Sequence, residues 1–232
     1  MLAAHHPKRF EPAEIEARVA TKLVQSLPAG AYARLARYLD LLYRWNQRMN
    51  LTAVRDPAIL MELHLAECLR AAQRIPACVE SVLDFGSGAG LPGIPIQIAR
   101  PDLHVTLAES QKKKAVFLQE VLRVLGLAHA AVHAGRVENL PAGQTFDLVT
   151  LRAVDKMAEA LKASATRIRP PLGSKKGWCL VLTSLPEAEK IRALEGVPAG
   201  QSAAQPAGMD WSLPEPIPAT DQRVLLIGYR SR

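Results

Sequence analysis

The chain has 232 residues, of which 49% are hydrophobic and 22% are charged. That apolar share excludes a disordered chain, and the length allows one large domain or a core domain with an extension. The formal net charge of +7 favours an anionic partner, most commonly nucleic acid. Charge that serves only solubility is the alternative.

The three cysteines, Cys68, Cys78 and Cys179, are scattered, and no pair has the spacing of metal ligands. This usage predicts a reduced, cytoplasmic protein without a metal site or disulfides. No apolar run reaches membrane-spanning length and the N-terminus lacks a signal-peptide core, so we expect no membrane partner.

The first third of the chain is predicted to be helical and basic. Apolar residues at helical spacing predict one helix over residues 11–27 and a second from about 31 to 48. Asp56 as N-cap and Pro57 at the first helical position predict a third helix, which ends before Pro76.

From residue 81 onward, predicted strands alternate with predicted helices, which indicates a parallel sheet covered on both faces. No helix separates the last two strands, so they are expected to close the sheet in antiparallel fashion, and the proline-rich segment 214–218 cannot be a central strand. The strands are predicted at 81–85, 103–109, 130–133, 146–151, 178–182, 209–213 and 223–229, and the helices at 91–100, 112–125, 156–168 and 186–195.

Seven strands in this arrangement are typical of the α/β Class I methyltransferases, which have a Rossmann-like sheet with the last strand antiparallel. We expect residues 1–76 to form an N-terminal helical extension and residues 77–232 to form the methyltransferase domain. The two parts are expected to pack as one globular unit.

A glycine-rich turn follows the strand at 81–85 and can be interpreted in two registers. Gly86, Gly88 and Gly90 form G-x-G-x-G directly after Asp84, the form typical of S-adenosylmethionine (AdoMet) sites. Starting from Gly88, the pattern is the G-x-G-x-x-G of dinucleotide sites. The first register begins at the strand end and is favoured; a tight turn without a ligand is the structural alternative.

Ligands of such sheets bind at the carboxyl ends of the strands. Glu109 at the second strand end suits ribose hydroxyls, the stretch at 136–138 suits adenine, and Arg152 suits a phosphate or carboxylate. The alternatives are a solvated acid, a surface loop, and an ion pair of Arg152 with Asp155. His64 is more readily explained as structural, and the low aromatic content of 5% offers no evident base-stacking platform.

Several short motifs together resemble the small-subunit rRNA methyltransferase G family, also called glucose-inhibited division protein B. The resemblance extends from about residue 35 to the last strand. It rests on Trp45-Asn46, Asn50-Leu51-Thr52-Ala53, His64, the loop from Asp84 through Gly93 to Pro95, Glu109-Ser110, Lys113 to Leu118, and Arg152-Ala153.

The resemblance implies a bacterial cytoplasmic enzyme that moves a methyl group from AdoMet to N7 of guanine 527 in the 530 loop of 16S rRNA, on the 30S subunit or an assembly intermediate. We expect a monomer. Arg152 and His64 would be the catalytic residues. By the resemblance, the cofactor would contact Gly86, Leu91, Val137, Glu138 and Arg152. The glycine-turn motif and the strand end add Asp84, Gly88, Gly90 and Glu109 as expected cofactor contacts.

The chain departs from the family at Leu63 (usually Arg), Glu67 (usually Asp) and Thr183-Ser184 (usually Lys-Gly). Two other functions remain open on the sequence. One is an AdoMet methyltransferase for another RNA or a small molecule, and the other is a non-catalytic RNA-binding module that retains an AdoMet pocket.

Overall fold

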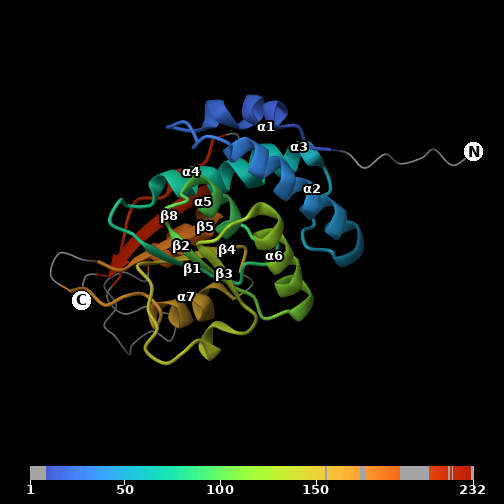
Figure 1. The fold of residues 1–232 in the computed structure, drawn as a ribbon. Helices are drawn as coiled ribbons and strands as arrows, with labels where there is room; N and C mark the ends of the chain where they lie inside the picture. Colours follow the sequence, from blue (N-terminus) through green and yellow to red (C-terminus); the bar gives the residue numbers. More distant parts are fainter. Residues whose placement is uncertain are drawn as a thin grey trace, which may run out of the picture.

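The computed structural model describes residues 9–154, 156–172, 176–193, 209–218, 220 and 222–230. These residues form an eight-stranded mixed sheet flanked by helices, and a group of N-terminal helices lies over one side of it (Figure 1). The N-terminal group comprises α1 (Pro12–Val19), η1 (Ala20–Lys22), α2 (Ala31–Met49), α3 (Pro57–Ile59), η2 (Leu60–Leu65, a π-helix) and α4 (Ala66–Arg74).

The sheet has the strand order β3-β2-β1-β4-β5-β8-β6, and β7 also pairs with β8. The first five strands are parallel, whereas β8 runs antiparallel to β5, β6 and β7. The strands are β1 (Ser81–Phe85), β2 (His104–Ala108), β3 (Ala130–His133), β4 (Leu148–Arg152), β5 (Trp178–Ser184), β6 (Met209–Trp211), β7 (Glu215–Pro216) and β8 (Arg223–Arg230). The connecting helices are α5 (Gly93–Ala99), α6 (Lys112–Leu125), η3 (Val137–Asn139), α7 (Met157–Ala165) and α8 (Leu185–Ala193).

The predicted strand pattern is confirmed except at the sheet edge, where β7 adds a two-residue strand. Pro216 has no N–H to donate, and among the described strands β7 pairs with β8 alone, so the proline lies at an edge as expected. The Glu215 carboxylate forms ion pairs with Arg70 (2.7 Å) and Arg74 (2.9 Å) on α4. These contacts attach the proline-rich segment to the N-terminal helices.

Successive strand residues face two different hydrophobic cores. Val82 and Leu148 pack with α2, α4, α5 and α6, whereas their neighbours Leu83 and Val149 pack with α7 and α8. Alternate side chains of a strand point to opposite faces, so a parallel sheet covered on both faces needs apolar residues at consecutive positions. This explains why the strand sequences are almost continuously apolar.

The N-terminal helices differ from the prediction in one place and agree in another. The first helix ends near Lys22, not at residue 27, because the backbone is extended at Leu23 and the side chain of Val24 is 68% exposed. The predicted cap of the third helix is confirmed, since the Asp56 carboxylate accepts the Ala58 N–H at 2.7 Å.

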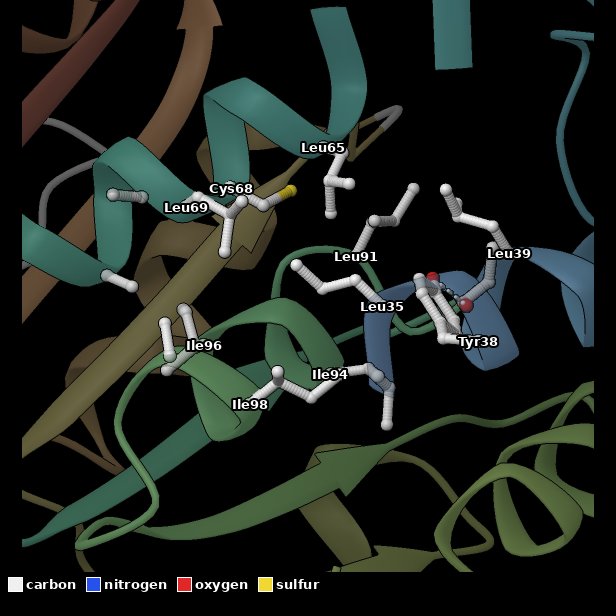
Figure 2. Packing of buried hydrophobic residues seen from close by; sticks show 14 of the residues in the cluster. Leu35, Tyr38, Leu39, Leu65, Cys68, Leu69, Leu91, Ile94, Ile96 and Ile98 are labelled. Atoms are coloured by element: carbon white, nitrogen blue, oxygen red, sulfur yellow. Dashed lines mark hydrogen bonds between the residues drawn. The ribbon is translucent and has the colours of Figure 1, made fainter. Parts of the chain in front are cut away.

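A continuous core joins the N-terminal helices to α5 and the glycine turn. Figure 2 shows Leu35, Tyr38 and Leu39 of α2 facing Leu91 and Ile94, with the side chains of α4 on the other side. The buried Tyr38 hydroxyl also donates to the carbonyl of Ala89 at 2.8 Å. The division of the chain at residue 76 stays a prediction. Within the described ranges, no helix has the length and apolar character needed to cross a membrane.

Candidate active site

A cavity of about 600 Å³ lies at the carboxyl ends of β1, β2 and β4. This is the point where the strand order reverses, with β2 on one side of β1 and β4 on the other, and ligands of such sheets bind there. The lining residues come from the glycine turn, the ends of these strands, residues 51–54, α6, His64 and Arg223; they include Gly86, Gly88, Leu91, Glu109, Lys114 and Arg152.

A second cavity, of about 450 Å³, adjoins the first and contains the stretch after β3. Both cavities are lined by Phe85, Gly86 and Ser110. Val137 and Glu138 line the second cavity. The fold therefore brings the predicted adenine-side residues next to the glycine turn, since Gly86 of the turn lines both cavities.

The three glycines of the turn all have positive φ, at 69° for Gly86, 56° for Gly88 and 89° for Gly90. A Cβ at Gly86 would meet no atom of the described residues within 4 Å, which agrees with its place on the cavity wall. A Cβ at Gly90 would lie 2.6 Å from Cγ1 of Ile94, closer than packed carbons allow. Gly90 is therefore required for packing and is not among the lining residues of either cavity.

Asp84 lies beneath the turn with only 1% of its surface exposed. Its carboxylate accepts the Thr150 hydroxyl at 2.8 Å and the Gly93 N–H at 3.2 Å. Burial raises the pKa of Asp84 to about 6, although the hydrogen bonds from Thr150 and Gly93 act to lower it. In this structure Asp84 connects β1, β4 and α5, and it is not among the residues that line the cavity.

Glu109 also holds the turn, but its side chain lines the cavity. One carboxylate oxygen accepts the Gly88 N–H at 2.9 Å and the other accepts the Gln111 N–H at 2.7 Å. Each carboxylate oxygen has a second lone pair, so Glu109 can still accept hydrogen bonds from two hydroxyl groups of a ligand. This is the chemistry that the sequence predicted for the position.

A cluster of charged residues forms another part of the cavity wall. Glu67 is only 2% exposed. One of its carboxylate oxygens accepts a hydrogen bond from Nη2 of Arg152 at 3.3 Å, and the other accepts one from Nε of Arg223 at 3.2 Å. Arg152, Arg223 and His64 all line the cavity. The predicted alternative partner of Arg152, Asp155, lies outside the described residues.

Arg152 Nη2 also hydrogen-bonds to Nδ1 of His64. A guanidinium has only donors, so Nδ1 must be the unprotonated acceptor and the imidazole is neutral. Burial, followed by the charge of Arg152, lowers the pKa of His64 to about 4, which gives the same protonation state near neutral pH. The fold thus places the two predicted catalytic residues in direct contact.

Arg223 was missed by the sequence reasoning, although the topology contains a signal for it. β8 runs antiparallel to β5 and pairs Arg223 with Ser184. Arg223, as the first residue of an antiparallel strand, therefore lies at the end of the sheet where the parallel strands finish. Thr150 was also missed; a hydroxyl within the apolar run of β4 was its only signal.

The strand order, the glycine turn at the switch point and the acid that follows β2 define a Class I methyltransferase. Solved structures with this fold include the mitomycin 7-O-methyltransferase MmcR (16% identical, TM-score 0.56, covering 94% of this chain and 67% of that one). Another is M. jannaschii TYW2 in complex with AdoMet (17% identical, TM-score 0.52, covering 72% and 74%). At these identities the likeness concerns the fold alone.

Sequence comparison gives the family within this class. The model of rRNA small subunit methyltransferase G matches residues 31–204. Ribosomal RNA small subunit methyltransferase G of Xanthomonas campestris pv. campestris (strain B100) is 43% identical over 191 residues, covering 82% of this chain and 85% of the relative. The Stenotrophomonas maltophilia (strain K279a) protein of that name is 44% identical over 161 residues, covering 67% and 75%. The chain therefore belongs to the rRNA small subunit methyltransferase G family and is an enzyme, as the sequence motifs predicted.

Proposed function

We propose that the enzyme transfers a methyl group from AdoMet to N7 of guanine 527 in the 530 loop of 16S rRNA. The observation that carries the proposal is the cavity itself, in which the glycine turn and Glu109 adjoin the Arg152–His64 pair. We further propose that the enzyme acts in the cytoplasm as a monomer, on the 30S subunit or an assembly intermediate. In this proposal residues 1–76 are the helical extension of a methyltransferase domain at 77–232.

The residues that line the two cavities suit the cofactor by their chemistry. Gly86 and Gly88 offer a wall without side chains, and Glu109 offers lone pairs to ribose hydroxyls. Val137 and Glu138 would hold the adenine side in the second cavity, while Asp84 and Gly90 keep the turn in shape. When bound, AdoMet would supply an electrophilic methyl group on a sulfonium sulfur.

Arg152 and His64 would hold and orient the RNA base. N7 of a neutral guanine already has a lone pair, so no residue has to remove a proton before the reaction. A neutral His64 that accepts a hydrogen bond from Arg152 agrees with a mechanism based on alignment. Arg152, held by Glu67, would position the RNA or the cofactor through its planar guanidinium.

A methylation assay in vitro tests this function. Purified protein and labelled AdoMet, incubated with naked 16S rRNA, 30S subunits and 70S ribosomes, should yield one N7-methylguanine, located at position 527 by mass spectrometry of RNA fragments. A methyl group on another nucleotide, or none on any small-subunit substrate, would overturn the proposal.

The cofactor assignment has a test of its own. Glu109→Ala should weaken AdoMet binding about 10-fold or more in calorimetry, because hydrogen bonds to a charged group contribute about 1.5–3 kcal/mol. Glu189→Ala, an exposed acid on α8, is the matched control and should leave the affinity unchanged. Equal affinities for the two variants would count against the role of Glu109.

A further inference from the structure

A groove of about 850 Å³ lies outside the proposed active site, between the C-terminal half of α2 and α6. It is larger than the cavity at the strand ends, and the two helices that form it lie side by side in Figure 1. Its lining residues are Leu41, Tyr43, Arg44, Trp45, Gln47, Arg48, Met49, Lys113, Glu120 and Val124. None of the functional residues named above belongs to this set.

The groove carries an excess of positive charge. Arg44, Arg48 and Lys113 are exposed, and none of them forms a salt bridge with any residue that the structure describes. The acid of the groove, Glu120, is paired with Arg123 at 2.9 Å. By contrast, Lys190 on the other side of the sheet is paired with an acid on its own helix. An anionic ligand is the natural complement of this arrangement.

Two aromatic side chains also line the groove, and both are held from behind. Trp45 packs against the buried Phe117 with ring centroids 5.6 Å apart, and Tyr43 packs against the buried Phe10 at 6.3 Å. Both are half-buried, so part of each side chain faces the groove. Cations and fixed aromatic rings together are what single-stranded nucleic acids bind. The groove is thus a candidate stacking site that the low aromatic content had concealed.

The groove adjoins the proposed active site across the first turn of α6. Lys113 lines the groove, while its neighbour Lys114 lines the cavity at the strand ends. The same division occurs at the end of α2, where Met49 lines the groove and Leu51 lines the cavity. One extended ligand can therefore contact both sites by crossing the N-terminus of α6.

We propose that the α2–α6 groove binds a single-stranded segment of the substrate RNA next to the nucleotide that enters the active site. Arg44, Arg48 and Lys113 contact its phosphates, and Trp45 with Tyr43 supports its bases. The inference rests on the proposed function, because it takes RNA as the substrate. A basic groove alone would also suit an acidic protein segment, but the two aromatic side chains that line it favour RNA.

The first test reverses the groove charges with Arg44→Glu/Arg48→Glu. The matched control is Lys162→Glu/Lys190→Glu, which makes the same charge change at exposed positions on α7 and α8. The groove variant should raise KM for 30S subunits or a 530-loop RNA about 10-fold or more, with kcat and AdoMet affinity unchanged. When the logarithm of the affinity for the 530-loop RNA is plotted against the logarithm of the salt concentration, the slope of the groove variant should be less steep than that of wild type by about 1.4. This corresponds to about 0.7 for each of the two lost phosphate contacts. A KM and a salt slope equal to those of the control would overturn the proposal.

The second test measures RNA at the groove without any methyl transfer. In a Trp178→Phe/Trp211→Phe background, Trp45 is the only tryptophan, and the 530-loop RNA should quench its emission. If that background does not fold, the difference between wild type and Trp45→Phe gives the same readout. Emission unchanged at saturating RNA, or changed only by an acidic peptide, would overturn the proposal. If no small-subunit RNA is methylated but Trp45 is still quenched, the proposed function fails while the groove stands.

Discussion

The cavity at the strand ends has two sides that are built in different ways. On the loop side, comprising the glycine turn with Asp84 and Glu109, carboxylates accept hydrogen bonds from backbone N–H groups and a hydroxyl. On the charged side, comprising His64, Glu67, Arg152 and Arg223, one carboxylate holds two guanidinium groups. The loop side depends on backbone shape, whereas the charged side depends on a single negative charge.

The largest effect is expected from removing that charge. Glu67→Gln keeps the volume but leaves Arg152 and Arg223 without their shared carboxylate, and breaking a buried ion pair costs about 3–5 kcal/mol. Urea denaturation should show this loss in the free energy of unfolding, and enzyme assays should show weaker turnover because Arg152 and His64 lose their fixed positions.

The exposed pair Lys190–Glu187 provides the control. Glu187→Gln should change the free energy of unfolding by about 0.5 kcal/mol or less. Glu67→Asp, which has the residue usual in the family, should retain most of the stability because it keeps the charge. A Glu67→Gln protein as stable as wild type would show that the charged side does not depend on this carboxylate.

The next effect tests the loop side through its buried acid. The pKa of Asp84 is raised from 3.8 to about 6 in the folded protein. The folded state therefore binds a proton more tightly, and this stabilisation is complete below pH 3.8 and is lost as the pH rises through 6. Raising the pKa from 3.8 to about 6 corresponds to about 3 kcal/mol in total.

Asp84→Asn removes this dependence, because an amide can accept from Gly93 and donate to Thr150 at every pH. Between pH 4 and pH 7, the free energy of unfolding of wild type should fall relative to that of the variant by about 2.5 kcal/mol. Denaturant titrations at several pH values measure the difference. Parallel curves for the two proteins would mean that Asp84 is ionised in the folded state throughout this range.

The two sides also differ in how far the sequence predicted them. The residues of the loop side lie next to strand ends in the chain, so Gly86, Gly88 and Glu109 followed from the strand–turn–helix pattern. The charged side joins η2, α4, β4 and β8, which meet only in the folded chain. Arg152 was predicted from its place at a strand end and His64 from the family resemblance, but their contact and the role of Arg223 depend on tertiary packing that no local pattern encodes.

Packing beneath the turn gives Asp84 and Gly90 a structural role that the motif did not indicate. Their positions in the motif indicated cofactor contact, yet Asp84 is buried and Gly90 lies against Ile94. A glycine motif does not distinguish residues that face the ligand from residues that allow the turn to pack. That distinction requires the positions of neighbouring side chains.

A smaller effect is expected from crowding the base of the loop side. A Cβ at Gly93 would lie 2.3 Å from Cδ2 of Leu107 and 2.7 Å from Oδ2 of Asp84. Gly93→Ala should therefore lower the free energy of unfolding by about 2–3 kcal/mol, measured by urea denaturation. Gly143→Ala is the control. Gly143 has φ of 76°, but a Cβ there would meet no atom within 4 Å in the part of the chain that the structure describes, so strain alone should cost about 1 kcal/mol. Equal losses would show that the turn can move to accept a side chain.

The smallest effect comes from His64, and its sign is opposite to that of Asp84. The pKa of His64 falls from 6.5 to about 4 on folding, so the unfolded chain binds a proton that the folded protein excludes. Stability from this source is complete above pH 6.5 and is lost as the pH falls towards 4. Because the ring is partly exposed, we expect about 1 kcal/mol and not the full value of the shift.

Between pH 4 and 6 the two groups therefore offset each other in wild type, and single variants should separate them. His64→Gln should leave the Asp84 contribution, so that stability falls as the pH rises. Asp84→Asn should leave the His64 contribution, so that stability rises with pH over the same range. Denaturation curves of wild type, both single variants and the double variant measure the two slopes independently. A His64→Gln curve parallel to wild type would indicate that the imidazole titrates normally, and that Arg152 does not hold it in the neutral form.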